Sequence, residues 1–487
     1  MTWYDKPFKT LPEQIALLRS RGMHIGDESA ASAHLLAIGY YRLSGYWYTF
    51  RESAPPCAVA CACRSHRADT FVAGTSLDQV VELYEFDRAL RLLVLDAIER
   101  VEVALRMRLG HVLGEGSAFA HLDPALLETA FTRFDDRRPQ ASRSHWLGSE
   151  HAKWLSKVRA EEDRSKEDFV VHFKARYGMP LPVWVVTELL TFGSLVTLVG
   201  GLKRRQKNLI AETFGVFDAD CEGDGAAFGS WVSCLAYLRN ICAHHGRLWN
   251  RNIVEQFGRL DVVAELEHAS APRAKSRVYA PLAVLAFLTS QIDPTSTWRL
   301  RVTELLADRF DTLGMSYAHM GFVDNWTDEA LWSAGYVPAG DPIPAEHREI
   351  LRHFECMGTA EAGMVVDPSP VARRRSSAVR YLRSKNHLLG LPVGKSYRFP
   401  SFQFDVGNQS LHPVVRKINI ALNAGPEPWR AARWWITANG GAHGRAPLTM
   451  LGSRADQQLL EAAQIAPPHP VAATVRVADL PAADVET

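Results

Sequence analysis

The sequence predicts an all-α protein in which a large helical bundle is followed by a smaller, mostly helical domain. Apolar residues recur at spacings of three and four over long stretches, as on the buried face of a helix. Alternation typical of strands is rare, and glycine- or proline-rich segments separate the helical stretches. The chain has 487 residues, which is room for about two to four domains.

The longest expected helix begins after Ser76, because Ser76 followed by Gln79 is a typical helix start. One apolar stripe follows at helical spacing: Leu83, Phe86, Leu90, Leu93, Ala97, Val101 and Leu105. Glu102 and Arg106 lie one turn apart, and we expect them to form an outward-facing ion pair. Further helices are expected from Pro182 to Gly200-Gly201 and over about 203–214, 228–245 and 280–292.

Composition narrows the class of protein. A formal charge of +1 does not indicate nucleic-acid binding, so any basic surface must be local. The first thirty residues lack an apolar signal core, and there is no apolar run of about 18 residues, so we expect no membrane partner. Seven unevenly spread cysteines suit a reducing compartment better than a disulfide framework. We therefore expect a cytoplasmic protein that needs no cofactor.

Residues 51–76 are rich in Pro, Ala, Ser and Cys, which indicates a loop insertion. This segment contains four side chains that could in principle ligate zinc: Cys57, Cys61, Cys63 and His66. Their spacing matches no common zinc module, and alanine fills the gaps. The sequence favours a loosely packed loop over a metal site.

The most informative stretch is Y-L-R-N-I-C-A-H-H-G-R-L-W-N-R, at the end of the helix expected over 228–245. Each helical residue advances about 100°, so Asn240 and His244 share the polar face with Tyr237. His245 projects onto the buried stripe if the helix persists that far, and Gly246 is expected to end the helix as a left-handed cap. Arg239 lies about 140° from His244, so one straight helix does not display the two side by side. A twofold dimer would bring both pairs together.

This combination suits cleavage of RNA, whose 2′-hydroxyl is a built-in nucleophile. Arg239 would bind the scissile phosphate, and His244 would move a proton, because imidazoles exchange protons near neutral pH. Asn240 would orient the imidazole or the phosphate. The flanking candidates for RNA binding are Tyr237, Arg247 and Arg251. The alternative is a capped, polar helix end without catalysis.

R-N-I-C-A-H-H-G-R-L-W-N-R resembles the signature of the Abi-like (AbiD/AbiF-type) abortive-infection proteins of the HEPN superfamily. Similar segments occur in order at 6–23, 38–47, 83–91, 188–195 and 320–326, so the resemblance covers about residues 4–332. It implies a HEPN-type helical bundle and a dimeric, metal-independent ribonuclease that acts as a toxin during phage infection. The implied catalytic residues are Arg239, Asn240 and His244, with His245 as the alternative histidine.

The remainder of the chain is expected to form a linker over 333–364, a second domain over 365–465 and a disordered tail over 466–487. Residues 371–385 carry six basic side chains and no acid: Arg373, Arg374, Arg375, Arg380, Arg383 and Lys385. Residues 365–465 look similar to MbcA/ParS-type antitoxins, which implies binding of DNA or of a toxin–antitoxin partner through this domain. A solvated basic helix is the alternative.

Together these observations predict an endoribonuclease toxin of an abortive-infection system, with a C-terminal regulatory module. The expected partners are an RNA substrate and a second copy of the chain. The competing hypothesis is a non-catalytic, RNA-binding or interaction scaffold of HEPN type whose C-terminal domain binds DNA or a partner protein.

Overall fold

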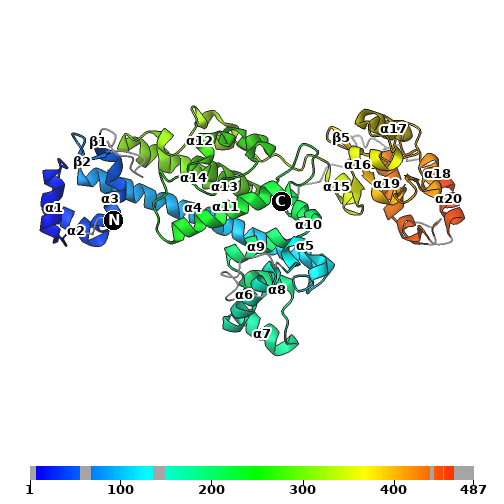
Figure 1. Cartoon of the computed structure of the whole chain (residues 1–487), viewed down its shortest axis with the longest axis horizontal. Coiled ribbons are helices and arrows are strands. Elements are labelled where there is room, and N and C mark those ends of the chain that lie inside the picture. The colour runs from blue at the N-terminus through cyan, green and yellow to red at the C-terminus, as the bar shows by residue number, and fades with distance from the viewer. Residues whose placement is uncertain are drawn as a thin grey trace, which may run out of the picture. The chain divides into compact units, whose positions relative to one another are not determined.

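A computed structural model describes residues 7–54, 67–134, 148–438, 442, 444–452 and 455–465. The described chain is mostly helical, which confirms the predicted fold class (Figure 1). It divides into two compact units, Met1–Gly340 and Asp341–Thr487. None of the described helices combines the length and the hydropathy needed to cross a membrane.

The first unit is built almost entirely from helices. Its α-helices are α1 (Leu11–Ser20), α2 (Glu28–Ala37), α3 (Tyr40–Trp47), α4 (Leu77–Gly116), α5 (Thr129–Thr132), α6 (Glu150–Arg164), α7 (Asp168–Tyr177), α8 (Val183–Leu189), α9 (Phe192–Gly201), α10 (Arg204–Thr213), α11 (Gly225–Ala243), α12 (Pro272–Lys275), α13 (Tyr279–Ile292) and α14 (Trp298–Leu305). Short 3₁₀ turns and one π-helical turn, η6 (Leu306–Phe310), connect them.

Helix α4 is the central element of this unit. It is 40 residues long and begins at the expected cap, where the Ser76 hydroxyl accepts a hydrogen bond from the Gln79 amide at 3.1 Å. The predicted apolar stripe of α4 is buried. Helices α3, α8, α10, α11, α13 and α14 pack against it, and Figure 1 shows α11 running beside it. The stripe therefore supplies much of the core.

The expected single helix from Pro182 to Gly201 is wrong, because the chain breaks at Leu190 and Thr191 into α8 and α9. The Thr191 hydroxyl caps α9 by accepting from the Ser194 amide, and the Leu190 carbonyl accepts from Arg106 at 3.0 Å. These local bonds outweigh helical continuity. The Glu102–Arg106 pair forms, but both side chains are mostly buried rather than outward-facing.

The expected loop over 51–76 is also partly wrong. Strands β1 (Arg51–Ser53) and β2 (Arg67–Phe71) pair antiparallel, with Arg51 opposite Phe71. Residues 51–53 and 67–71 therefore form a short antiparallel ladder instead of a loop. The possible zinc ligands Cys57, Cys61, Cys63 and His66 lie outside the described residues.

The second unit begins earlier than expected, because most of the predicted 333–364 linker is folded. It contains α15 (Ala345–Arg352), β3 (Cys356–Met357), α16 (Thr359–Val366), α17 (Ala372–Ser384), β4 (Leu391–Val393), β5 (Ser396–Pro400), β6 (Phe404–Asp405), β7 (Ser410–Leu411), α18 (Pro413–Ala421), α19 (Pro428–Ile436) and α20 (Asp456–Ile465). Strands β3, β5 and β4 form an antiparallel sheet in that order. Ile350 and Phe354 enter the core of this unit. The expected tail over 466–487 lies outside the described residues.

Candidate functional site

Helix α11 carries the arginine–histidine motif at its C-terminal end. The Asp224 carboxylate caps its first turn by accepting from the Ala227 amide at 2.9 Å. Trp231, Leu235 and Leu238 are buried and fix the helix against the core. Burial of this stripe leaves the opposite side of the last turns toward solvent.

Arg239, Asn240 and His244 are all exposed. The Arg239 guanidinium donates a weak hydrogen bond to the Asn240 side-chain oxygen at 3.4 Å. Within the part of the chain that the structure describes, no hydrogen bond links Arg239 to His244. The guanidinium and the imidazole are therefore both accessible to a ligand, but one chain does not hold them against each other.

The prediction that His245 lies in the buried stripe is wrong. Helix α11 ends at Ala243 with His244 as the C-cap, so helical projection stops there. His245 is exposed and left-handed, with φ 58°. Its amide donates to Cys242 at 3.1 Å, and the Gly246 amide donates to Ile241 at 2.8 Å. This is a Schellman cap with histidine where glycine is usual, so His245 holds a strained conformation.

Gly246 does not provide the left-handed cap that the sequence predicted, since the positive φ belongs to His245. Its small size matters for a different reason. A Cβ on Gly246 would lie 3.2 Å from the Ile241 carbonyl oxygen and 3.5 Å from an Arg251 nitrogen. The turn is therefore tightly packed immediately after the candidate catalytic residues.

A buried carboxylate fixes the chain that follows this turn. Asp87 on α4 is fully buried and accepts from the Leu248 amide at 3.0 Å and the Trp249 amide at 2.6 Å. It also accepts from the Tyr46 hydroxyl at 2.7 Å and pairs with Arg91. Burial raises the pKa of Asp87, while Arg91 and the three other donors oppose that effect. One Asp87 oxygen accepts from the two backbone amides and the other accepts from the Arg91 guanidinium, groups that can only donate, so we assign Asp87 as a carboxylate.

Helix α3 supports the same turn from another side. Arg42 donates to the His245 carbonyl at 2.8 Å, and Arg247 donates to the Gly45 carbonyl. Three segments that are far apart in the sequence, 38–47, 83–91 and 237–251, thus meet around one turn. Asp87 is not among the site residues predicted from the sequence. The signal was an acid and a base, Asp87 and Arg91, four residues apart on an otherwise apolar face.

The three predicted RNA-binding residues differ in their surroundings. Tyr237 is half-buried and packs against the core. Arg247 is half-buried, and burial lowers the pKa of its guanidinium, although Tyr46 and Asp87 oppose that effect. Arg251 is half-buried, and it donates weakly to the Arg247 carbonyl at 3.5 Å. Arg247 and Arg251 therefore contribute to local structure.

The motif cysteine is not a reactive group. Cys242 is buried, and burial together with Asp87 raises the pKa of its thiol to about 12. A thiol with that pKa stays protonated at neutral pH and is a poor nucleophile or metal ligand. Among the residues that the structure describes, no group of three or more His, Cys, Asp or Glu side chains is arranged to hold a metal ion.

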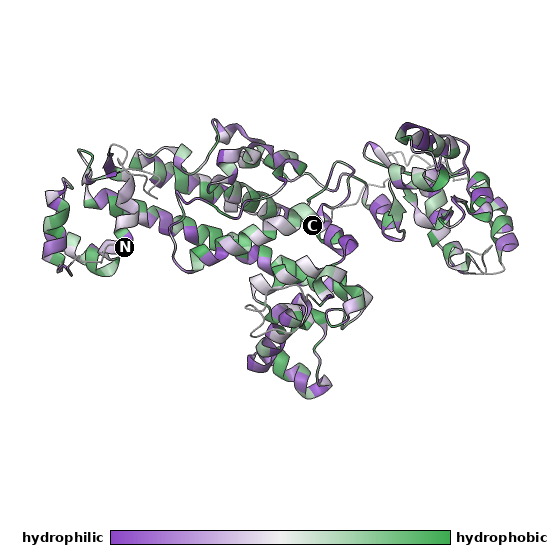
Figure 2. Ribbon diagram, viewed as in Figure 1, coloured by the Kyte–Doolittle hydropathy of each residue, from purple (hydrophilic) through white to green (hydrophobic). Residues whose placement is uncertain are grey.

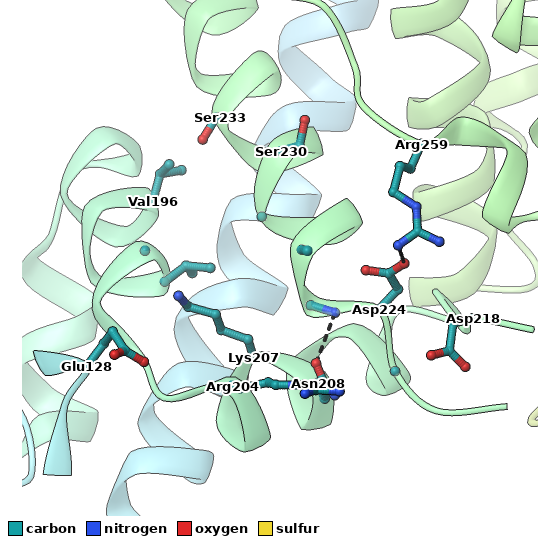
Figure 3. Close-up of a pocket in the computed structure, with 16 residues that line it drawn as sticks. Glu128, Val196, Arg204, Lys207, Asn208, Asp218, Asp224, Ser230, Ser233 and Arg259 are labelled. Atoms are coloured by element: carbon teal, nitrogen blue, oxygen red, sulfur yellow. Dashed lines mark hydrogen bonds and ion pairs between the residues drawn. The ribbon is translucent and has the colours of Figure 1, made fainter. Parts of the chain in front are cut away.

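A hollow of about 580 Å³ lies beside the opposite end of α11 (Figure 3). Its charged lining is mixed: Arg204, Lys207 and Arg259 against Glu128, Asp218 and Asp224. Figure 3 shows Arg259 turned toward Asp224, with which it pairs at 2.7 Å. None of the site residues predicted from the sequence lines this hollow. It is separate from the arginine–histidine motif.

In the second unit, five of the six predicted DNA-binding residues lie on α17 and Lys385 is its C-cap. Figure 2 draws much of α17 in the purple of hydrophilic residues. Arg374 pairs with Asp367 at 3.3 Å, Arg375 donates to the Ser369 carbonyl, and Arg383 stacks over the Tyr397 ring at 3.9 Å. Several of these side chains therefore have structural partners. Arg373 and Arg380 are exposed.

In a comparison with protein families, residues 33–250 fit the family described as Abi-like protein. The match covers less than half of the chain, and it includes all of α3, α4 and α11. Comparison with curated proteins and with solved structures gives no match. The matched region contains the exposed arginine and histidine, together with the buried aspartate beneath their turn. Residues 33–250 of this chain are thus similar to the Abi-like proteins.

Proposed function

We propose that this protein is a metal-independent endoribonuclease of the HEPN type that acts as a cytoplasmic toxin in abortive infection. The Abi-like family is associated with abortive infection. The observation that carries the proposal is the end of α11, where Arg239, Asn240 and His244 are exposed. The turn beneath them is held by Asp87, Arg42 and helix α3. Rigid support below accessible polar groups is the arrangement that catalysis by positioning requires.

In the proposed reaction, the ribose 2′-oxygen attacks the adjacent phosphorus and the bond to the 5′-oxygen of the next nucleotide breaks. Arg239 would donate hydrogen bonds to the phosphoryl oxygens, where negative charge grows in the transition state. His244 would take the 2′-hydroxyl proton or give a proton to the leaving 5′-oxygen. The products would be a 2′,3′-cyclic phosphate and a 5′-hydroxyl.

We also propose that the active form is a homodimer. Arg239 and His244 are about 140° apart around α11, so a twofold arrangement of two copies would surround one phosphate more fully than one chain does. Mixing Arg239→Ala protein with His244→Ala protein tests this idea. A shared site predicts recovery of activity on mixing, whereas independent sites predict none.

The test of the nuclease itself compares labelled RNA incubated in EDTA with wild type, Arg239→Ala and His244→Ala. Each substitution is expected to slow cleavage by about 100-fold or more, the usual loss for such a group. His172→Ala and Arg176→Ala are matched controls, since both residues are exposed on α7. They should cleave as wild type does. Equal cleavage by all five proteins would remove the mechanism and favour the non-catalytic scaffold.

For the second unit we propose a regulatory module, antitoxin-like, that binds DNA or a partner through α17. Support comes from the exposed Arg373 and Arg380, which lie on the same side of that helix. Expression of residues 1–340 alone should be more toxic to cells than expression of the whole chain if this module restrains the nuclease. Equal toxicity would exclude restraint in cis and leave the nuclease proposal standing.

A further inference from the structure

The chain that follows the arginine–histidine motif packs on a distant part of the first unit. Arg277 donates to the Asn250 carbonyl at 2.6 Å, and the Ile253 amide donates to the Ser276 carbonyl at 2.9 Å. The Trp249 and His319 rings meet edge to face, with centroids 6.0 Å apart. Residues 273–277 and 316–321 therefore lie directly beside the end of the motif.

This neighbourhood is rich in positive charge. A Cβ on Gly321 would lie 2.5 Å from the Arg277 Cβ and 2.8 Å from the Arg273 carbonyl oxygen, so the chain at 319–321 sits against both arginines. His319, Arg273 and Arg67 are exposed. Partial burial lowers the pKa of His319, and so do the charges of Arg277, Arg273 and Arg67. The charged groups that act most strongly on this imidazole are thus all arginines.

Within the described ranges, the three arginines Arg67, Arg273 and Arg277 form no close ion pair with a carboxylate. Arg67 and Arg277 donate to backbone carbonyls, of Arg51 and Asn250. Neither they nor Arg273 forms an ion pair there with an aspartate or glutamate, whereas other arginines of the first unit, such as Arg88 and Arg106, do. Uncompensated cations gathered on one surface repel one another, so the arrangement favours an anionic ligand.

Helix α3 contributes a further cation beside the motif. Arg42, which holds the His245 carbonyl, is exposed, and its neighbour Tyr41 is 91% exposed. We define the basic patch as Arg42, Arg67, Arg273, Arg277 and His319. A track of cations with an exposed aromatic ring is the usual surface for a single-stranded nucleic acid, in which phosphates meet the cations and bases stack on the ring.

We propose that the basic patch binds the backbone phosphates of single-stranded RNA and so holds the substrate that is cleaved at Arg239 and His244. This inference rests on the proposed nuclease function, which it extends by naming the binding surface and the single-stranded form of the substrate. The hollow in Figure 3 fits this ligand less well, because its cations are balanced by an equal number of acids. The patch residues would position the strand rather than take part in the chemistry.

The affinity of the protein for a labelled RNA tests this proposal directly. For single-stranded RNA, the logarithm of the binding constant falls linearly with the logarithm of the salt concentration, with a slope of about −0.7 for each phosphate contact. One contact therefore strengthens binding about fivefold at 0.1 M salt relative to 1 M salt. In a protein that carries Arg239→Ala and His244→Ala, the added change Arg273→Ala should weaken binding of a labelled RNA about fivefold at 0.1 M salt. Adding Arg67→Ala as well should weaken it about 25-fold, with a slope flatter by about 1.4.

Arg176→Ala on α7 and Lys207→Ala at the hollow are the control variants, and both should bind RNA as the parent does. In the otherwise wild-type protein, Arg273→Ala should raise KM for RNA and leave kcat unchanged. Thermal unfolding of the Arg67→Ala, Arg176→Ala and Arg273→Ala proteins should match that of their parents, because these three side chains are exposed.

The outcomes separate the two proposals. If the Arg67→Ala/Arg273→Ala protein keeps the RNA affinity of its parent and the same dependence of that affinity on salt, the basic patch does not bind RNA, whether or not the wild type cleaves it. An equal loss in the control variants would also overturn the patch, since binding would then be diffuse. If the wild type cleaves nothing but the patch variants lose affinity as stated, the nuclease fails and the RNA-binding surface stands. Equal loss for duplex RNA would contradict the single-stranded substrate.

Discussion

Replacing Asp87 by asparagine should destabilise the first unit and loosen the turn that follows the motif. The asparagine keeps the shape of the side chain, but it removes the charge that pairs with Arg91 and one of the acceptor oxygens. Breaking a buried ion pair from one side costs about 3–5 kcal/mol, since the remaining charge is left buried and unpaired. Asp87 is fully buried, and Arg91 nearly so.

The expected change in melting temperature follows from the size of the unit. For Met1–Gly340, an unfolding entropy of about 2.1 cal/mol/K per residue gives about 0.7 kcal/mol/K. A loss of about 3–5 kcal/mol then lowers Tm by about 4–7 °C. Differential scanning calorimetry is the suitable measurement, because the two units can unfold in separate transitions.

Asp96→Asn is the matched control on the same helix. Its side chain is 33% exposed and pairs with Arg301 at 2.9 Å. Surface pairs of this kind contribute about 0–1 kcal/mol, so Tm should change by about 1.5 °C or less. RNA cleavage should fall in Asp87→Asn protein and persist in Asp96→Asn protein. If Asp87→Asn melts within about 1 °C of wild type, the buried Asp87–Arg91 pair does not stabilise the turn.

Other substitutions test the packing, the buried histidine and the helix cap. Gly201→Ala should lower the free energy of unfolding, measured by urea titration, by about 1–3 kcal/mol, because the added Cβ would lie 2.3 Å from the Phe131 ring. Gly200→Ala is the control, because its Cβ would meet nothing within 4 Å, and it should leave the free energy of unfolding unchanged. Burial lowers the pKa of His121 to about 4, so the fold keeps this imidazole neutral and loses up to about 3 kcal/mol as pH falls from about 6.5 to about 4. His121→Phe should remove that part of the acid destabilisation, and an identical pH profile would contradict it. His245→Gly should raise Tm slightly by relieving the left-handed strain while cleavage continues; lost cleavage would make His245 the catalytic histidine.

Much of the helical framework could be predicted from the sequence. The cap at Ser76 and the apolar stripe of α4 are visible as a periodic pattern, and the helices expected over 203–214, 228–245 and 280–292 correspond to α10, α11 and α13. Periodicity works for α4, α10 and α11 because each of these helices buries one face. Helix α13 is buried on all sides, and the sequence shows it as an apolar run. Periodicity fails at Leu190, where a carbonyl bonded to a distant arginine ends one helix and a threonine begins the next.

Only the part of the candidate site that lies on a regular helix could be predicted from the sequence. The exposure of Asn240 and His244 follows from helical projection, since both lie within or at the end of α11. The position of His245 does not, because the chain leaves helical geometry one residue earlier. The supporting role of Asp87 depends on contacts across about 160 residues of sequence, which local spacing does not reveal. The basic patch likewise gathers Arg67 and Arg273 from separate elements.

Cleavage of an RNA with a single 2′-deoxy nucleotide at the mapped cut site, in EDTA, tests the central claim most directly. The wild type should cut the all-ribose strand and leave a 2′,3′-cyclic phosphate, and it should not cut at the deoxy position. Arg239→Ala and His244→Ala should each lose about 100-fold or more in the single-turnover rate on the ribose strand. Continued cutting at the deoxy position, or full activity in either variant, would contradict an arginine and a histidine acting on a phosphodiester attacked by its own ribose.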